Sequence, residues 1–432
     1  MKIDRMIYDA IGVGFGPSNL ALAIALDEAT RRRGHSFATH FIEKQARFAW
    51  HGGMLLPGSD MQISFLKDLV LLRDPTSRFT FLNYLHARGR LEFLINQKIF
   101  YPSRTEFNDY LTWAAGHFAE SVAYGEEVVA IEPESSRGAV THLAVRTRDA
   151  SGQERTRLAR NLVLAVGGHP KIPHIFQPLN GDARAFHSSA YLPAIASLGL
   201  PDTPATRIAV IGRGQSAAEI ALDLHNRFAH ARIDMITRGF ALRPADDTPF
   251  VNEIFNPAYT DFIYHQPEPV RDAILGEFRN TNYAVVDADL IRTLYGILYQ
   301  QKVAGAERLA IMSMREVVDV GWTLASITLN VRDMAARVCR STPYDAVVLA
   351  TGYERDNGGR LLEGLSDYLP GLSAERNYRL KATSDFAPAI YMQGSSEATH
   401  GLSDTLLSVL AIRAEEIASA LIAGADARQS AA

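Results

Sequence analysis

Residues 8–17 read Tyr8-Asp9-Ala10-Ile11-Gly12-Val13-Gly14-Phe15-Gly16-Pro17, and this stretch decides the fold class. A short apolar run enters a glycine-rich turn, and Ser18 to Ala29 then has the Leu and Ala content of a helix. The first glycine of such a turn makes it tight, and the second lets a pyrophosphate approach the backbone at a helix N-terminus. Pro17 departs from the usual third glycine, although proline suits the first turn of a helix. The pattern predicts a dinucleotide-binding strand, turn and helix.

An acidic residue follows the next predicted strand, Phe37 to Ile42. Glu43 is placed where a carboxylate can accept both ribose hydroxyls, which favours a nucleotide without a 2′-phosphate. We therefore expect FAD at Gly12, Gly14 and Gly16. The alternative interpretation is a solvated carboxylate at a strand end.

The same unit recurs about two hundred residues later. Arg207 to Ile211 is a predicted strand, and Gly212-Arg213-Gly214-Gln215-Ser216-Ala217 fits the Gly-x-Gly-x-x-Gly/Ala form fully. The helix Ser216 to Asn226 and the strand Ala231 to Thr237 follow, and that strand ends at Arg238 instead of an acid. A cation there can pair with a 2′-phosphate, and Arg213 can share the role. This site is predicted to bind NADPH, with a surface arginine as the alternative interpretation of Arg238.

Alternating strands and helices predict an α/β protein with a parallel, doubly wound sheet in each of two Rossmann-like domains. We assign residues 1–200 and 341–425, including a strand over Asp345 to Ala350, to the FAD-binding domain. Residues 201–340 form the predicted NADPH-binding domain, with the first boundary at Leu198 to Thr206, where Gly and Pro interrupt the pattern. Residues 245–300 are expected to form a small, mostly helical substrate subdomain, and the Ala-rich residues 426–432 a disordered tail.

Bulk composition excludes several functions. The 432 residues carry a formal net charge of −4 with no block of like charge, so nothing suggests nucleic acid or a membrane surface as partner. Cys339 is the one cysteine, which rules out an intrachain dithiol centre and a disulfide reductase. No iron–sulfur ligand set is present, and we predict no metal. The N-terminus lacks a signal-peptide pattern, so a cytoplasmic protein is expected.

The chain also resembles a known family. Shared segments include Gln62-Ile63-Ser64-Phe65-Leu66-Lys67-Asp68-Leu69, Asp74-Pro75-Thr76-Ser77, Pro249-Phe250-Val251-Asn252-Glu253, Asn280-Thr281-Asn282-Tyr283, and His400 to Ser408. They resemble the N-hydroxylating flavin monooxygenases of siderophore biosynthesis, and among these the L-ornithine N5-monooxygenases, over roughly residues 6–420. The resemblance implies that FAD, NADPH and O2 convert the ornithine side-chain amine into a hydroxylamine, with a flavin hydroperoxide as the oxidant. It also implies a homo-oligomer, a tetramer or a dimer.

Site residues carry over by position from this resemblance. Lys67 is expected to pair with the substrate carboxylate, Asn252 and Asn282 to hold the amine groups, and Ser408 to add a polar contact. Either Asn280 or Asn282 suits the second amide, and the spacing favours Asn282. The remaining predicted contacts are with the cofactors: Lys44, Trp50, His51, Gln62 and Leu406 for FAD, and Gln215 and Ser216 for NADPH.

These residue types suit oxidation at nitrogen. The amine must attack with a free lone pair, yet its lysine-like pKa of roughly 10 keeps it protonated in neutral water. A carboxylate in the pocket would raise that pKa further, whereas neutral amides hold the nitrogen without doing so, and a cation such as Lys67 disfavours the charged amine. No side chain is needed as a catalytic acid, base or nucleophile.

Other interpretations remain open. Taken alone, Lys67 reads as a surface lysine and each asparagine as a turn or capping residue. Ser403 and Asp404 read as an N-cap for a last helix over Thr405 to Ala423. The same reaction on L-lysine or a diamine is the nearest alternative activity, and Lys67 argues against a diamine because a diamine has no carboxylate. A flavin reductase serving a protein partner and a non-catalytic nucleotide-binding protein are the other two classes.

Overall fold

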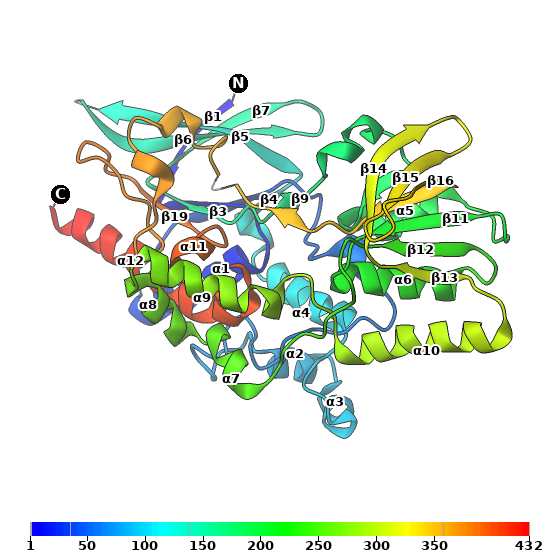
Figure 1. Cartoon of the computed structure of the whole chain (residues 1–432). Coiled ribbons are helices and arrows are strands. Elements are labelled where there is room, and N and C mark those ends of the chain that lie inside the picture. The colour runs from blue at the N-terminus through cyan, green and yellow to red at the C-terminus, as the bar shows by residue number, and fades with distance from the viewer. Residues whose placement is uncertain (1, 35, 137, 357, 432) are drawn as a thin grey trace.

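A computed structural model shows two α/β units side by side (Figure 1) and describes residues 2–34, 36–136, 138–356 and 358–431. The first unit is built on a five-stranded parallel sheet in the order β19-β8-β2-β3-β4. Its strands are β2 (Ala10–Val13), β3 (Thr39–Glu43), β4 (Val122–Tyr124), β8 (Asn161–Leu164) and β19 (Ala389–Met392). Three of these strands, β2, β8 and β19, are buried at every residue, as expected for a sheet covered on both faces.

Helices cover one face of this sheet. They are α1 (Pro17–Arg33), α4 (Arg104–Gly116) and α12 (Leu410–Ala431), while α2 (Phe81–Ala87) packs on α4 and α3 (Leu91–Gln97) packs on α2, farther from the sheet. α1 packs along α12, and Leu20, Ile24, Ala414 and Ile417 share one core between them. The other face is covered by a second sheet, ordered β1-β7-β6-β5. Its strands are β1 (Lys2–Tyr8), β5 (Glu126–Ser136), β6 (Ala139–Asp149) and β7 (Glu154–Ala159).

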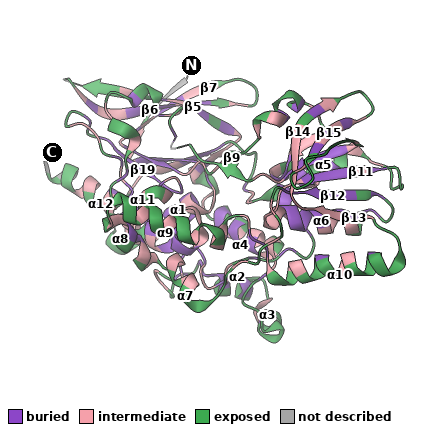
Figure 2. Cartoon of the chain, in the orientation of Figure 1, coloured by how far each residue is buried: buried purple, intermediate pink, exposed green. Residues whose placement is uncertain are grey.

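The second unit has its own parallel sheet, ordered β10-β17-β11-β12-β13. The strands are β10 (Ala185–His187), β11 (Arg207–Ile211), β12 (Arg232–Ile236), β13 (Leu309–Met312) and β17 (Ala346–Leu349). One face carries α5 (Tyr191–Leu198), α6 (Gln215–Arg227) and α10 (Ala288–Ala304). The other face carries an antiparallel meander of β14 (Arg315–Trp322), β15 (Ile327–Asp333) and β16 (Cys339–Tyr344). Buried residues gather along both parallel sheets, while α10 keeps an exposed outer face (Figure 2).

Between β12 and β13 the chain makes a helical excursion toward the first unit. It contains α7 (Pro249–Asn252), α8 (Pro257–His265) and α9 (Glu268–Asn282), of which α8 and α9 contact the short helix α11 (Glu397–His400) of the first unit. Its two ends meet, because Ala245 N donates to Val286 O at 3.0 Å and Val286 N donates to Arg243 O at 2.9 Å. The chain crosses between the units through β9 (His169–Pro170) and β18 (Tyr353–Glu354), which pair with each other.

The predicted α/β class with two Rossmann-like domains is confirmed, but neither parallel sheet is doubly wound, because helices cover one face of each and β-strands cover the other. The domain boundaries at 200/201 and 340/341 are also wrong. β10 and α5 precede residue 200 and β17 follows residue 341, yet all three belong to the second unit. The crossings at β9 and β18 mark the true boundaries. Likewise α10 packs against α6 and β13, so within 245–300 only α7 to α9 form the helical excursion.

Two predictions about the C-terminal helix are also wrong. Residues 426–431 are not disordered, since α12 runs to Ala431 and Asp426 pairs with Arg33 at 3.3 Å; residue 432 lies outside the described residues. Alanine-rich sequence has high helix propensity, which accounts for the extension. The helix begins at Leu410, not Thr405, and Ser403 and Asp404 lie in a separate 3₁₀ turn, η8 (Leu402–Thr405), instead of capping it.

Candidate functional site

The first glycine turn fits a phosphate group closely. Gly14 has φ of +80°, and a Cβ there would lie 2.5 Å from Ala165 O, so only glycine is tolerated. At Gly16, the N-cap of α1, a Cβ would meet no atom within 4 Å, so the helix end faces open space. That end has no side-chain cap and no acidic residue in its first turn, so its backbone N–H groups remain available to an anion.

Buried polar side chains brace this turn. Asn19 donates from Nδ2 to Gly14 O at 2.7 Å, and its Oδ1 accepts from Gln393 Nε2 at 2.9 Å. Glu43 is buried, and its two oxygens accept from Phe15 N at 2.7 Å and from Gln45 N at 2.9 Å. The alternative interpretation of Glu43 as a solvated carboxylate is therefore wrong. Lys44, the next residue, is exposed.

The second turn repeats these features. A Cβ on Gly212 would lie 2.4 Å from Ala350 O, and Gly214 caps α6 without a side-chain hydrogen bond. Within the described part of the chain, the guanidinium groups of Arg213 and Arg238 form no ion pair with a carboxylate. Gly239 makes room beside Arg213, because a Cβ there would lie 2.9 Å from Arg213 Nη1. Among the described residues, these two cations without an ion pair flank the end of β12, an arrangement that suits a 2′-phosphate.

Gln215 and Ser216 are the other two residues of this turn with a predicted contact to NADPH. Gln215 turns its side chain away from the turn to Asp287, donating from Nε2 to Asp287 Oδ2 at 3.0 Å and accepting from Asp287 N at 2.9 Å. Ser216 follows it in the first turn of α6, where it is partly buried.

An aromatic group lies where the two units meet. The Trp50 and His51 rings are 4.6 Å apart, and His51 faces Tyr353 of the crossing strand β18 at 6.4 Å. Desolvation by the surrounding protein, with the nearby charges of Arg104 and Arg355, lowers the pKa of His51 to about 4, although the residue is exposed by area. His51 is therefore neutral at physiological pH. The predicted flavin contacts Gln62 and Leu406 are exposed and half-buried, respectively.

Lys67 lies on a loop that is clamped to the first unit. Its side chain is half-buried, burial lowers its pKa, and its ammonium forms no ion pair within the described ranges. The neighbouring Asp68 carboxylate is buried and accepts the N–H groups of Val70, Leu71 and Phe81 at 2.8, 2.7 and 2.7 Å. Burial raises the pKa of Asp68 to about 6 despite these hydrogen bonds.

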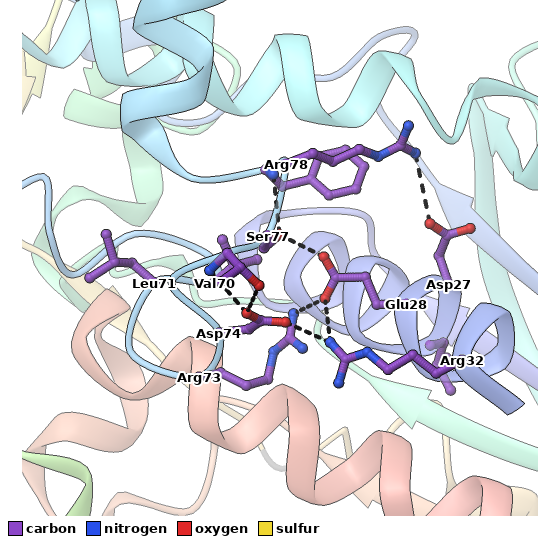
Figure 3. A network of polar contacts seen from close by, with 12 residues as sticks. Asp27, Glu28, Arg32, Val70, Leu71, Arg73, Asp74, Ser77 and Arg78 are labelled. Atoms are coloured by element: carbon purple, nitrogen blue, oxygen red, sulfur yellow. Dashed lines mark hydrogen bonds and ion pairs between the residues drawn. The ribbon is translucent and has the colours of Figure 1, made fainter.

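Figure 3 shows the next turns of this loop held against α1 by charge pairs. Glu28 of α1 accepts from Arg73 Nη2 at 2.5 Å and from Ser77 Oγ at 2.6 Å, and Arg32 of α1 donates to Asp74 at 2.6 Å. The run Asp74 to Ser77 thus fixes the loop that presents Lys67.

The asparagines lie at helix ends of the excursion. Asn252 is the last residue of α7 and Asn282 the last of α9; both are half-buried, whereas Asn280 is exposed. On α9, Ile274 and Phe278 line an apolar cavity against Gly401 and Leu402. At about 100° per residue, Asn282 lies roughly 40° from Phe278 around the helix axis and Asn280 roughly 160°. The inward face of α9 is therefore the face of Asn282.

Ser408 lies in η9 (Leu407–Val409), directly after η8, on which both α9 and the turn after Asn252 pack. Its hydroxyl is buried without a hydrogen-bond partner in the described residues, a state that calls for a polar ligand. Sequence reasoning missed the support for this loop, a fully buried Asp404–Arg413 ion pair of 2.9 Å. Arg413 also donates to Ser18 Oγ of α1 at 3.1 Å, and His400 is a buried packing residue stacked on Tyr378.

The structure brings the elements of Asn252, Asn282 and Ser408 together around η8. The loop of Lys67 approaches from another side, where Leu72 lines a surface hollow with Pro257 and Ala258 of α8. In the described part of the chain, each glycine turn leads into a helix whose N-terminus has no side-chain cap. An acid lies beside the first turn, and two arginines without an ion pair in the described residues lie beside the second. This combination defines the class of oxidoreductases that hold two dinucleotides.

Comparison with known proteins narrows this class. Residues 6–355 match the family model of L-lysine 6-monooxygenase/L-ornithine 5-monooxygenase, and the chain belongs to this family. It is 50% identical over 416 residues to the L-ornithine N(5)-monooxygenase of Pseudomonas aeruginosa, covering 96% of this chain and 94% of the relative.

Solved structures of related proteins have the same fold as this chain. The ornithine hydroxylase from Pseudomonas aeruginosa superimposes with a TM-score of 0.93, covering 97% of this chain and 100% of that one at 50% identity. The ornithine N-hydroxylase of Kutzneria sp. 744, described with reduced FAD, NADP+ and L-ornithine, gives a TM-score of 0.91 at 39% identity, covering 97% and 99%.

Proposed function

We propose that this protein is an FAD- and NADPH-dependent monooxygenase that converts L-ornithine, O2, NADPH and a proton into N5-hydroxyornithine, NADP+ and water. The product is the precursor of hydroxamate siderophores. The single observation that carries the proposal is the family membership with 50% identity to an L-ornithine N(5)-monooxygenase across nearly the whole chain.

The residues present fit both cofactors. The free N-terminus of α1, with Gly14 and Gly16, would hold the FAD pyrophosphate, and Glu43 keeps unused lone pairs for the ribose. The N-terminus of α6 would hold the NADPH pyrophosphate, with Arg213 and Arg238 at its 2′-phosphate. Bound FAD, once reduced by NADPH, supplies the activation of O2; the chain itself positions the cofactors and substrate and excludes water.

The proposed substrate contacts fall into two groups, one for the carboxylate of ornithine and one for its amines. Lys67, a half-buried cation with no ion pair among the described residues, would anchor the α-carboxylate. Asn252 and Asn282 would hold the amines by neutral hydrogen bonds, so the side-chain amine is not stabilised as an ammonium. The buried Ser408 hydroxyl, which has no hydrogen-bond partner in the described residues, would complete the polar contacts.

L-Lysine is the alternative substrate, since the family model includes L-lysine 6-monooxygenases. One methylene is worth only about 1–3 kcal/mol of discrimination in a pocket. Hydroxylamine formation measured on ornithine, lysine and putrescine decides between them. We expect ornithine to be preferred and putrescine to be poorest, and no product from any of the three would overturn the proposed function.

Assembly and location belong to the same proposal. Tyr295, Tyr299 and Val303 form an exposed stripe along α10, which suits contact with a second copy in a dimer or tetramer. Light scattering on a size-exclusion column tests this, with Tyr299→Arg expected to shift the mass toward the monomer. Among the described residues no helix is long and apolar enough to cross a membrane. The exposed free thiol of Cys339 suits a reducing compartment, and we propose the cytoplasm, which cell fractionation tests.

A further inference from the structure

A polar network lies where three parts of the molecule meet. Arg104, at the start of α4 in the first unit, makes a bidentate ion pair with Glu219 of α6 in the second unit at 2.9 and 2.7 Å. Gln215 donates to the same Glu219 at 2.9 Å and exchanges two hydrogen bonds with Asp287. Asp287 stands at the N-terminus of α10, where the helical excursion returns to the second unit.

The first unit contributes further contacts to this network. Arg104 also donates to Met54 O at 3.0 Å, and Gln62 donates to Asp287 at 3.4 Å. Met54 and Leu56 leave their own unit and pack into the core of the second. Next to them Gly53 touches the second unit so closely that a Cβ would lie 2.1 Å from Ser189 O.

Arg104 is the cation at the centre of the acidic groups at this junction. Burial raises the pKa of Asp60, the nearby carboxylates of Asp287 and Glu219 raise it further, and Arg104 lowers it. Arg104 and Glu219 are 13% and 6% exposed at their side chains, so each would be left as a desolvated, unpaired charge if the other were removed. The arrangement holds the two units at one relative position.

We propose that Arg104, Glu219, Gln215 and Asp287 form an interdomain latch that sets the distance between NADPH and FAD, and so the rate of hydride delivery. The inference rests on the proposed function. The inference goes beyond the proposed function because it assigns Arg104 and Glu219 as positioning residues. It also assigns the Gln215 side chain to holding Glu219 and Asp287 in place. Hydride transfer requires reacting atoms within about 3–3.5 Å, and a misplacement near 1 Å costs roughly 100-fold in rate.

The test is anaerobic rapid mixing of the FAD-loaded full chain with NADPH, for wild type, Arg104→Met, Glu219→Gln and the double variant. We expect the limiting rate of flavin reduction to fall roughly 10- to 100-fold in each single variant. The double variant should lose little more than either single one, because one pair acts as a unit. The dissociation constant for NADPH should change little, since the turn and its arginines bind the phosphates.

A matched pair controls for general loss of stability. Arg157 and Glu126 form an ion pair of 2.7 Å within the first unit, with side chains 10% and 7% exposed. Arg157→Met and Glu126→Gln should leave the reduction rate unchanged. In the latch variants, enzyme reduced chemically with dithionite should react with O2 at the wild-type rate.

Wild-type reduction rates in the latch variants would overturn the proposal, as would equal slowing in the Arg157 and Glu126 variants. A change in NADPH dissociation constant alone would make these residues simple cofactor contacts and would also overturn it. If Arg104→Met fails to fold, Arg104→Lys, which keeps the charge but loses the fork, carries the same expectation with smaller slowing. Failure of the proposed function is separate, because it appears as missing hydroxyornithine from wild type, whereas the latch is judged on flavin reduction.

Discussion

Replacing Lys67 with Met tests the substrate assignment most directly. Methionine keeps the length and much of the volume of lysine, so the clamped loop should keep its shape while the cation is lost. Asp68 and the Glu28–Arg73 contacts hold that loop independently of the Lys67 ammonium. The change therefore removes one charge and little else.

The magnitude follows from the burial of Lys67. A hydrogen bond to a charged group contributes about 1.5–3 kcal/mol. Because Lys67 is only half-buried, solvent screening places the value in the lower part of this range. At about 1.4 kcal/mol for each factor of ten, we expect the KM for ornithine to rise roughly 10- to 50-fold.

The assay follows hydroxylamine product and NADPH oxidation together, on ornithine and on putrescine. Putrescine has no carboxylate, so the variant should lose most of the wild-type preference for ornithine while its activity on putrescine stays nearly constant. Lys302→Ala, at an exposed position near the end of α10, is the matched control and should change neither substrate. An unchanged KM for ornithine, or an equal loss on both substrates, would refute the pairing of Lys67 with a carboxylate.

Three further outcomes are expected. Arg238→Ala should weaken NADPH far more than NADH in steady-state kinetics, and equal loss for both would assign the 2′-phosphate to Arg213 alone. Asn282→Ala should raise the ornithine KM or lower coupling of NADPH oxidation to product, whereas the exposed Asn280→Ala should change neither; the reverse result would exchange their roles. The folded-state pKa of Asp68, about 6, lies above its ordinary value of 3.8, so the folded chain binds this proton more tightly and the contribution of Asp68 to stability falls as pH rises from about 4 to 6. In urea unfolding across this range, the free energy of unfolding of wild type should fall with rising pH relative to that of Asp68→Asn, and a constant difference between the two would contradict this.

Local features of the site were predictable from the sequence because short segments determine them. The first glycine turn begins within β2, which contains Gly12, and the second follows directly on β11. Glu43 and Arg238 lie at or just beyond the ends of β3 and β12. Asn19 was missed although it lies five residues from Gly14, because a polar residue in an apolar helix carries no sign of its partner.

Features that depend on distant pairing were not predictable. β17 joins the second sheet through β10 and β11, and nothing in its apolar sequence says which of two parallel sheets it enters. Arg104 and Glu219 are 115 positions apart, and each alone reads as an ordinary surface charge. Asp404 is buried because it pairs with Arg413. The sequence alone does not show this pairing, so Asp404 was interpreted as a helix cap.

The paired ends of the helical excursion have a consequence for how such enzymes diversify. The bridge between Pro244 and Val286 closes α7, α8 and α9 into a cassette that enters and leaves the second sheet at a single point. A cassette of this kind can change length, or be exchanged for one from a related enzyme, without altering strand order in either sheet. A graft has to preserve its packing faces toward η8 and α11 and the Asp261–Arg376 ion pair. Amine selectivity can thus evolve, or be engineered, separately from the machinery that handles the two nucleotides.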